Sequence, residues 1–314
     1  MQEGDGHVAA SAAIDASAVL MTGGAPASEP VKPRRRFLRF SLRTFFVVLT
    51  VACVWLGYLV DSARRQKASV VALRRLGASV VYDYRTPNAV RLVVRRGSAS
   101  RDLGNWIPND RSPIPKWFRA WVGEDLLYNV GIVHLGRGPR RETSKQATDE
   151  ALRHVATFSH LTSLVLYGSQ ATDDDLKVIS KLRHLEYLYV YGPTTVSDRG
   201  VEHLASLERL VSLYISQAQI TDEALRVLGR LRQLEHLELP GNDFTDRGLG
   251  YLKNLRRLET LWVGGPDGPR IADEGLRSLE ELPALRDLAV GQSQVTPAAF
   301  ERLQRLKPGL RINR

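Results

Sequence analysis

A unit of about 24 residues repeats along the C-terminal half of this 314-residue chain, and this repetition constrains the fold more than any other feature. Most units start at a Thr-Asp or Ser-Asp pair, and the seven starts are at positions 148, 172, 197, 221, 245, 272 and 296. The spacings between them are 24, 25, 24, 24, 27 and 24 residues. Large apolar residues follow at offsets of 4, 7, 10 and 13, as in Leu225, Leu228, Leu231 and Leu234. A fixed period of this length is typical of solenoids, in which each unit buries its apolar face against its neighbours.

Each unit also contains a short Leu-x-Leu segment that predicts a β-strand. The first apolar residues of these segments are at positions 164, 188, 213, 237, 261 and 288. The Thr/Ser-Asp pair suits a helix start, because its side chains accept hydrogen bonds from free N–H groups and the acid faces the positive end of the helix dipole. A row of aspartates could also suggest a calcium site, but their recurrence at helix starts favours capping. The pattern predicts an α/β solenoid with seven or eight strands in a parallel sheet inside and helices outside.

This pattern resembles the leucine-rich repeat family in its 24-residue T-D-x-G-L form, over roughly residues 130–314. Val130, Val133 and Leu135 resemble one earlier strand, and Leu310 with Ile312 resembles the closing one. A position that is often Asn in the family is Asn242, Ser169, Ala218 or Ser293 here. The whole chain is similar to single-span leucine-rich repeat proteins of planctomycete bacteria, through RRRFLRFSLRT, ALRRLGASVVYDY and the T-D repeats. This resemblance implies an architecture but almost no mechanism. The same repeats occur in F-box receptors, but nothing upstream here resembles an F-box.

A run of 17 uncharged, mostly apolar residues from Thr44 to Val60 predicts a transmembrane helix. As a helix it would span roughly 26 Å, slightly less than a hydrocarbon core of about 30 Å. Trp55 and Tyr58 lie near its far end, where interfacial aromatic residues are common. Two alternatives remain open, a cleaved signal peptide and a soluble core helix. Six basic residues precede the run: Lys32, Arg34, Arg35, Arg36, Arg39 and Arg43.

The net charge is +10, and its positive part lies in residues 32–147, which contain 23 basic and 7 acidic residues, a net of +16; the rest of the chain is net negative. Because this charge adjoins the predicted span, acidic lipid headgroups are nearer partners than nucleic acid, and no nucleic-acid binding is expected. The basic residues before the span outnumber those directly after it. This asymmetry predicts a single-pass membrane protein with a cytoplasmic N-terminus and the repeats on the non-cytoplasmic side.

The chain is therefore divided into five segments: a disordered tail at 1–31, a basic juxtamembrane segment at 32–43, the span at 44–60, a membrane-proximal cap region at 61–129 and the repeat domain at 130–314. Met21 is an alternative start. In the cap region, apolar spacing predicts a helix that ends at Gly77, followed by a hairpin formed by residues 79–84 and 89–96. A short helix should begin at Pro115, and we expect Trp117 and Trp121 on its face to cover a core.

The sequence shows no catalytic or metal-binding motif. The only cysteine, Cys53, excludes a multi-thiolate zinc site. His160 and His184 should lie about 5 Å apart in adjacent repeats, but no third ligand is evident. Ser212, His236 and Asp287 fall in one column, although Asp287 is too far from His236 to orient it. We predict no enzyme activity, no cofactor and no metal.

Residues between and beside the strand leucines should point onto the concave face. Five tyrosines and a tryptophan gather there, and these residue types are enriched at binding hot spots. The alternative is that tyrosine is there only because it favours exposed strands. We predict a non-enzymatic, membrane-tethered module that binds a protein, peptide or envelope glycan through this face; the alternative is a structural envelope scaffold without a discrete ligand. The predicted ligand-binding residues are Tyr167, Tyr187, Tyr189, Tyr191, Tyr214, Glu238 and Trp262.

Overall fold

The structure is a computed structural model that describes residues 41–83, 112–136, 143–264, 271–291 and 293–313. The predicted tail at 1–31, most of the basic segment, the hairpin strand at 89–96 and the segments 137–142 and 265–270 lie outside these residues. The chain divides into two units, Met1–Thr50 and Val51–Arg314. The second unit contains the repeats.

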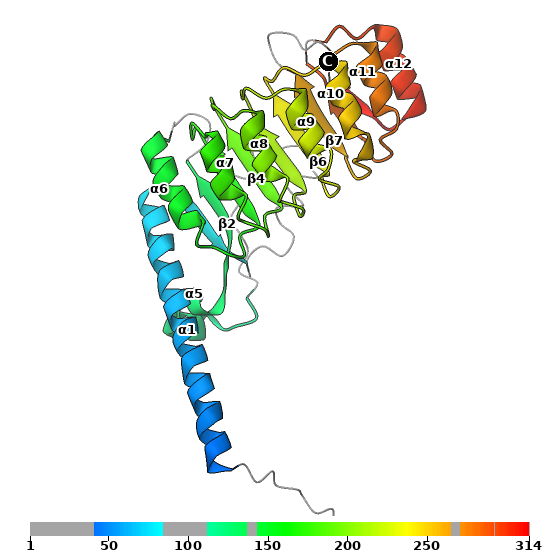
Figure 1. Cartoon of the computed structure of the whole chain (residues 1–314). Helices are drawn as coiled ribbons and strands as arrows, with labels where there is room; N and C mark the ends of the chain where they lie inside the picture. The colour runs from blue at the N-terminus through cyan, green and yellow to red at the C-terminus, as the bar shows by residue number, and fades with distance from the viewer. Residues whose placement is uncertain (1–40, 84–111, 137–142, 265–270, 292, 314) are drawn as a thin grey trace, which may run out of the picture. The chain divides into compact units, whose positions relative to one another are not determined.

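The described strands form one nine-stranded sheet in which spatial order follows sequence order (Figure 1). These strands are β1 (Ser79–Tyr82), β2 (Val130–Leu135), β3 (Ser163–Tyr167), β4 (Tyr187–Tyr191), β5 (Ser212–Ile215), β6 (His236–Pro240), β7 (Thr260–Gly264), β8 (Asp287–Ala289) and β9 (Arg311–Asn313). β1 pairs antiparallel with β2, and β2 to β9 are mutually parallel. The predicted parallel sheet is confirmed, including the earlier strand at Val130 and the closing strand at Ile312.

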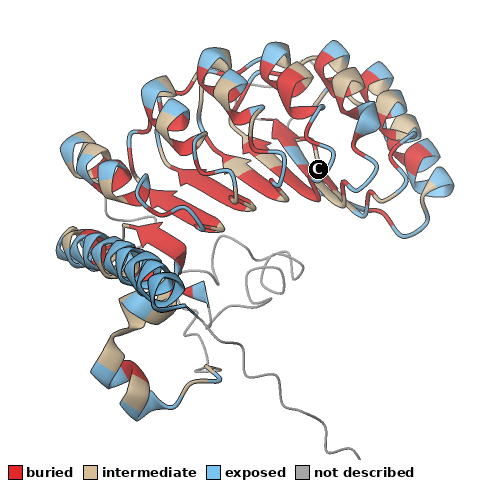
Figure 2. Ribbon diagram, turned by 60° about the horizontal axis from the view of Figure 1, so that its bottom comes forward, coloured by how far each residue is buried: buried red, intermediate tan, exposed pale blue. Residues whose placement is uncertain are grey.

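Short helices connect the strands and form the outer layer of the solenoid (Figures 1 and 2). They are α6 (Lys145–Val155), α7 (Asp173–Ile179), α8 (Asp198–Leu204), α9 (Asp222–Leu228), α10 (Asp246–Gly250) with the 3-10 turn η2 (Tyr251–Asn254), α11 (Asp273–Leu279) and α12 (Pro297–Leu306). The leucines of each unit fill one continuous core between sheet and helices. Leu213 and Leu237, for example, lie side by side in register on neighbouring strands and are fully buried. The repeat spacing therefore predicted this core correctly.

The first helix is longer than the predicted span. α1 runs without interruption from Leu42 to Arg75, so it joins the predicted span at 44–60 to the predicted helix that ends at Gly77. No Gly or Pro lies between Asp61 and Arg75, and Asp61 forms an ion pair with Arg65 one turn later, so nothing breaks the helix. It ends where predicted: Gly77 has a φ of +81°, and the Ala78 amide donates to the Leu73 carbonyl at 2.9 Å. This is the backbone geometry of a glycine C-terminal cap.

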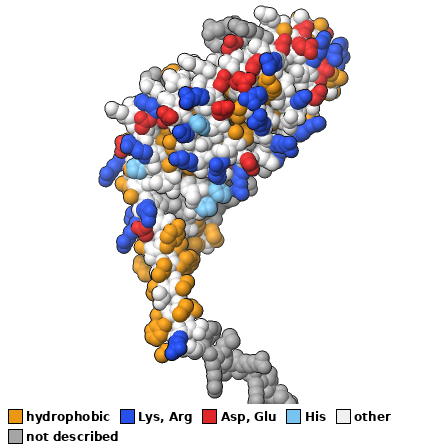
Figure 3. Space-filling view, in the orientation of Figure 1, with side chains coloured by type: hydrophobic (Ala, Val, Ile, Leu, Met, Phe, Trp, Pro, Cys, Tyr) orange, Lys and Arg blue, Asp and Glu red, His pale blue; other side chains and the backbone are white. Residues whose placement is uncertain are grey.

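The two ends of α1 have different environments. Val70 and Leu73 are buried in the repeat core, and the Ser69 hydroxyl lies 3.2 Å from the Thr157 hydroxyl, so the last turns of α1 cover the end of the solenoid. By contrast, the apolar side chains from Leu42 to Tyr58 are exposed. This helix is long and apolar enough to cross a membrane. Figure 3 shows the exposed apolar side chains gathered along α1.

The short helix after Pro115 forms as predicted, but its tryptophans do not cover a core. α4 (Lys116–Val122) is followed by α5 (Glu124–Leu127) after the single residue Gly123. Trp117 is 71% exposed and Trp121 is 80% exposed. The buried residue of α4 is Arg119, which pairs with Glu124 at 3.3 Å. The two tryptophans lie on one face of the helix, as their i, i+4 spacing predicted. Because Arg119 occupies the buried face, the tryptophan face is exposed.

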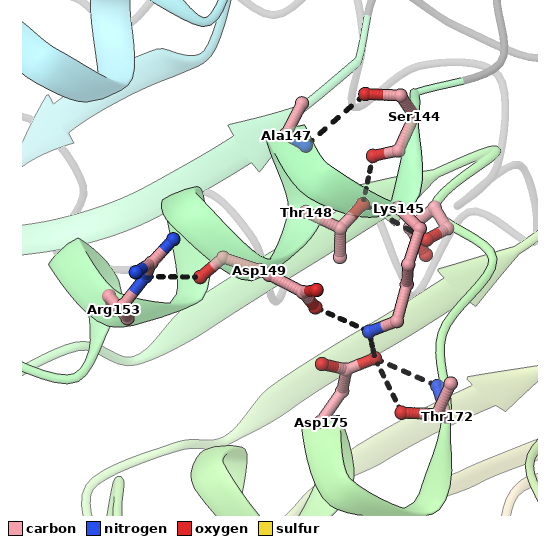
Figure 4. A network of polar contacts seen from close by, with 9 residues as sticks. Ser144, Lys145, Ala147, Thr148, Asp149, Arg153, Thr172 and Asp175 are labelled. Carbon is pink, nitrogen blue, oxygen red and sulfur yellow. Dashed lines mark hydrogen bonds and ion pairs between the residues drawn. The ribbon is translucent and has the colours of Figure 1, made fainter.

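The first repeat helix starts earlier than its Thr-Asp pair. Ser144 is the N-cap of α6, and its hydroxyl accepts a hydrogen bond from the Ala147 amide at 3.2 Å (Figure 4). Thr148 lies inside the helix and is buried, and its hydroxyl donates to the Ser169 carbonyl at 2.9 Å. The prediction that Thr148 begins a helix was therefore wrong. In this unit the helix begins at Lys145, before Thr148, whereas α7 to α10 begin directly after the corresponding Thr or Ser.

From the second unit onward, the paired aspartates link neighbouring repeats. Each Asp accepts hydrogen bonds from the helix-capping residue of the next repeat. Asp198, for example, accepts from the Thr221 amide at 2.8 Å and from the Thr221 hydroxyl at 2.7 Å. The sequence predicted capping within a repeat, and the Thr221 hydroxyl does accept from the Glu223 amide at 3.4 Å. The carboxylate itself, however, bonds across the repeat boundary. Equivalent contacts occur at Asp173, Asp222, Asp246 and Asp273.

Candidate functional site

The parallel register aligns the concave side chains in rows across the strands. One row runs through Val165, Tyr189, Tyr214, Glu238 and Trp262, each on the next strand. Neighbouring strands lie about 4.8 Å apart, so consecutive members of this row are in contact range. The predicted site residues therefore lie together on the concave side of the sheet, opposite the leucine core.

Most of the predicted tyrosines are buried rather than exposed. They belong to a second apolar cluster, separate from the leucine core, that comprises Ile132, Val165, Tyr167, Tyr187, Tyr189 and Tyr191. Tyr189 is 1% exposed and Tyr191 is 9% exposed. The expectation that these side chains are free to contact a ligand was wrong for four of the five tyrosines, because they pack on one another. The strands that carry these tyrosines, β3 and β4, are buried along their whole length, and Figure 2 colours the buried strands of the sheet red.

The tyrosine rings stack across the strands. The Tyr167 and Tyr191 ring centroids lie 4.7 Å apart with an interplanar angle of 11°, and those of Tyr191 and Tyr214 lie 4.2 Å apart. The Tyr189 hydroxyl lies 2.9 Å from the Ser212 hydroxyl. Burial raises the pKa of both Tyr189 and Tyr191 well above the ordinary tyrosine value. These phenols stay neutral and act as packing groups at physiological pH.

The open part of the concave face is the row of Tyr214, Glu238 and Trp262. Tyr214 and Glu238 are half-buried, and Trp262 is 41% exposed. Their strands β5, β6 and β7 are consecutive, so the carboxylate lies between two aromatic side chains. Burial raises the pKa of the Glu238 carboxyl to about 7. No hydrogen bond or ion pair found among the described residues involves this carboxylate.

Replacing Glu238 with glutamine is expected to remove a pH-dependent loss of stability. Because burial raises the pKa from 4.5 to about 7, the folded protein retains a proton that the unfolded chain releases between these values, and wild-type stability falls as the pH rises through them. Above that range the variant should be more stable by about 1–3 kcal/mol, and below it the two should be equal. Urea unfolding of the full chain in detergent micelles measures this difference. A difference that does not change with pH would contradict the assignment.

The two neighbouring histidines stack on each other, and the residues of the triad-like column have other polar partners. His160 and His184 stack with ring centroids 5.1 Å apart, close to the predicted separation. The described ranges contain no group of three or more His, Cys, Asp or Glu side chains able to hold a metal ion. In the column, His236 Nδ1 lies 3.1 Å from the Thr260 hydroxyl, Asp287 pairs with Arg311, and the Ser212 hydroxyl lies 2.9 Å from the Tyr189 hydroxyl.

One sequence signal could have revealed the buried tyrosines. The concave positions of β1 and β2 are also apolar, at Val81 and Ile132, and both pack with the tyrosine cluster. A concave face that begins with aliphatic residues indicates packing, because an exposed sheet face is usually polar. Further along the sheet the concave row becomes less buried at Tyr214, Glu238 and Trp262, which marks where the open surface begins.

Comparisons with known proteins gave structural similarities only. No protein-family model matches the chain, and no curated protein matches it. Among solved structures, internalin F of Listeria monocytogenes aligns with 51% of this chain at 21% identity and a TM-score of 0.37, and internalin C2 of the same organism aligns with 59% at 22% identity and a TM-score of 0.42. A leucine-rich repeat protein of Leptospira interrogans aligns with 64% at 23% identity and a TM-score of 0.40.

The alignments cover 49% of internalin F, 80% of internalin C2 and 51% of the Leptospira protein, so the chain spans about half the length of two of these structures. The fold is assigned from the sequence and structure of this chain. Its 24-residue period and its parallel sheet with one helix per strand are features of a leucine-rich-repeat-like solenoid. The described part of the second unit has a leucine-rich-repeat-like solenoid fold.

Proposed function

We propose that this chain is a non-enzymatic, membrane-tethered interaction module that binds a protein or peptide through the open concave row Tyr214, Glu238 and Trp262. The main support is the exposure of Trp262 beside a carboxylate with no partner among the described residues. Exposed tryptophan beside an unpaired acid is unusual on a surface that contacts only water.

The chemistry of the row favours a positively charged side chain on the partner. A lysine or arginine placed on Glu238 would neutralise its charge and lie between the rings of Tyr214 and Trp262, where cation–π attraction adds to the ion pair. The carboxyl pKa of about 7 shows that its surroundings disfavour the unpaired charge, and a bound cation would relieve this cost. An envelope glycan is the second ligand class, since sugars also stack on exposed aromatic rings.

Tethering is supported by α1, whose apolar residues up to Tyr58 are exposed. The excess of basic residues before the span favours a cytoplasmic N-terminus and a non-cytoplasmic repeat domain. Protease treatment of intact and lysed cells tests the side: the repeats should be cleaved in intact cells if they lie outside.

A binding experiment with matched variants tests the concave row. The full chain in detergent micelles is used to capture proteins from the envelope fraction, and a saturable partner is then titrated. The double variant Glu238→Gln/Trp262→Ala should weaken binding by roughly 30-fold or more, because hot-spot truncations cost about 2 kcal/mol or more. Lys253→Ala, an exposed change on the convex side, should leave binding unchanged.

Two results would count against concave binding. If the folded double variant binds the partner at full strength, the row is not the site. If the full chain captures only itself and assembles with increasing concentration, the alternative of a structural envelope scaffold without a discrete ligand is favoured. The basic residues around Lys145 are then the next surface to test.

A further inference from the structure

From the exposed tryptophans of α4, we infer that this helix is a second membrane contact, a peripheral lipid-interface anchor that holds the start of the repeat domain against the bilayer surface. This inference rests on the proposed tethering by α1. Its occupant is the headgroup and upper acyl-chain region of the same bilayer.

The exposed face of α4 has the composition of an interfacial segment. Trp117 and Trp121 are 71% and 80% exposed and lie one helical turn apart, with Phe118 between them. The Phe118 ring contacts both, at centroid distances of 5.6 Å and 6.0 Å. On the opposite face, Arg119 is buried against Glu124. Tryptophan concentrates at membrane interfaces because its ring is apolar and its N–H still reaches water or headgroups.

Hydrogen bonds hold α5, which follows α4 after Gly123, near the end of the apolar run. The Gln66 side-chain amide donates to the Tyr128 carbonyl at 2.8 Å and to the Asp125 carbonyl at 3.3 Å, which places α5 beside α1 (Figure 1). Gln66 lies six residues beyond Val60, or roughly 9 Å along the helix. Trp121 precedes Asp125 by only four residues, so its Cα lies within about 14 Å of it.

These lengths match the thickness of the bilayer surface layer. With the apolar run ending at Val60, the headgroup region extends roughly 5–8 Å beyond it. The contact at Gln66 is therefore near the outer edge of this layer, and α4 can reach the layer itself. A helix within this reach of the headgroup layer, with two exposed tryptophans, is able to contact lipid.

Charge around α4 is complementary to lipid phosphates. Arg64 and Lys67 are exposed on α1 within two turns of the end of the run, and Lys116 is exposed at the start of α4. Basic residues at this height attract acidic headgroups. The nearby acids Asp61 and Glu124 are paired with Arg65 and Arg119, so the remaining basic residues favour acidic lipid headgroups as the occupant.

Fluorescence of single tryptophan positions tests the contact. The five tryptophans are replaced by phenylalanine in sets, so that the full chain in lipid nanodiscs keeps only Trp117 and Trp121, only Trp55, or only Trp262. Phospholipids brominated near the headgroup end of the acyl chain quench tryptophans at the interface, and lipids brominated near the chain terminus quench deeper ones. We expect the Trp117/Trp121 protein to lose most of its emission with the shallow bromines and less with the deep ones. The Trp262 protein should keep its emission and respond only to aqueous iodide.

The outcomes separate the anchor from the tether. Quenching of Trp55 without quenching of Trp117 and Trp121 would overturn the α4 contact and leave the tether intact. If bromolipids do not quench Trp55, the proposed tether is refuted, and the α4 contact is refuted with it. A third outcome is that Trp117 and Trp121 are protected from iodide but are not quenched by bromolipids. If this protection disappears in nanodiscs that hold one copy, the contact is between copies and the lipid contact is refuted.

Discussion

Replacing Tyr189 with alanine is expected to lower the free energy of unfolding by about 3–5 kcal/mol, because truncating a fully buried aromatic ring leaves a large cavity. Tyr189 is 1% exposed, and its hydroxyl lies 2.9 Å from that of Ser212. The variant therefore loses both ring packing and a buried hydrogen bond. Urea unfolding of the full chain in detergent micelles, followed by circular dichroism, measures the loss.

Trp262→Ala is the matched control, since Trp262 occupies the same concave row but is 41% exposed. It should cost about 1 kcal/mol or less, as is usual for surface positions. The leucine core provides a reference for large effects: Leu213→Ala should cost about 2–5 kcal/mol. If Tyr189→Ala costs as little as Trp262→Ala, the tyrosine cluster is an exposed surface patch and its rings are available to bind a ligand.

Replacing Asp198 with alanine is expected to lower the free energy of unfolding by about 2–3 kcal/mol, since hydrogen bonds to charged groups are stronger than neutral ones. The Asp198 carboxylate accepts from the amide and hydroxyl of Thr221 and from the Ala224 amide at 3.2 Å. Its removal leaves the start of the next helix without these acceptors. Amide hydrogen exchange at Thr221 and Ala224 should become faster in the variant.

Asp246→Ala tests whether the number of contacts across the repeat boundary sets the effect. The next repeat has Ala272 where others have Thr or Ser, so the Asp246 carboxylate accepts one bond, from the Ala272 amide at 2.7 Å. This variant should cost about 1 kcal/mol, a typical value for the loss of one cap. Equal losses in the two variants would show that the aspartates act through helix charge alone. If added calcium stabilises the wild-type protein and Asp198→Ala abolishes this stabilisation, the calcium alternative is supported.

Sequence reasoning was most accurate where structure depends on local periodicity. The Leu-x-Leu segments predicted β3 to β8 because each strand has the same two inward positions, and the repeat length sets which residues are neighbours in the sheet. The end of α1 was predicted because Gly77 alone provides the left-handed backbone there. These features need no information about distant residues.

Burial and long-range contacts were decided by tertiary structure. Alternation placed Tyr189 on the concave side, but its exposure depends on the residues stacked across neighbouring strands, which its own repeat does not encode. The reach of Asp198 into the next repeat and the outward direction of Trp117 depend on side-chain packing between segments. The amino-acid sequence determined the repeats, the strands and their leucine core, because periodic local patterns specify them. The tertiary structure alone decided which concave and membrane-proximal aromatic residues remain exposed, because exposure is a property of the assembled neighbours.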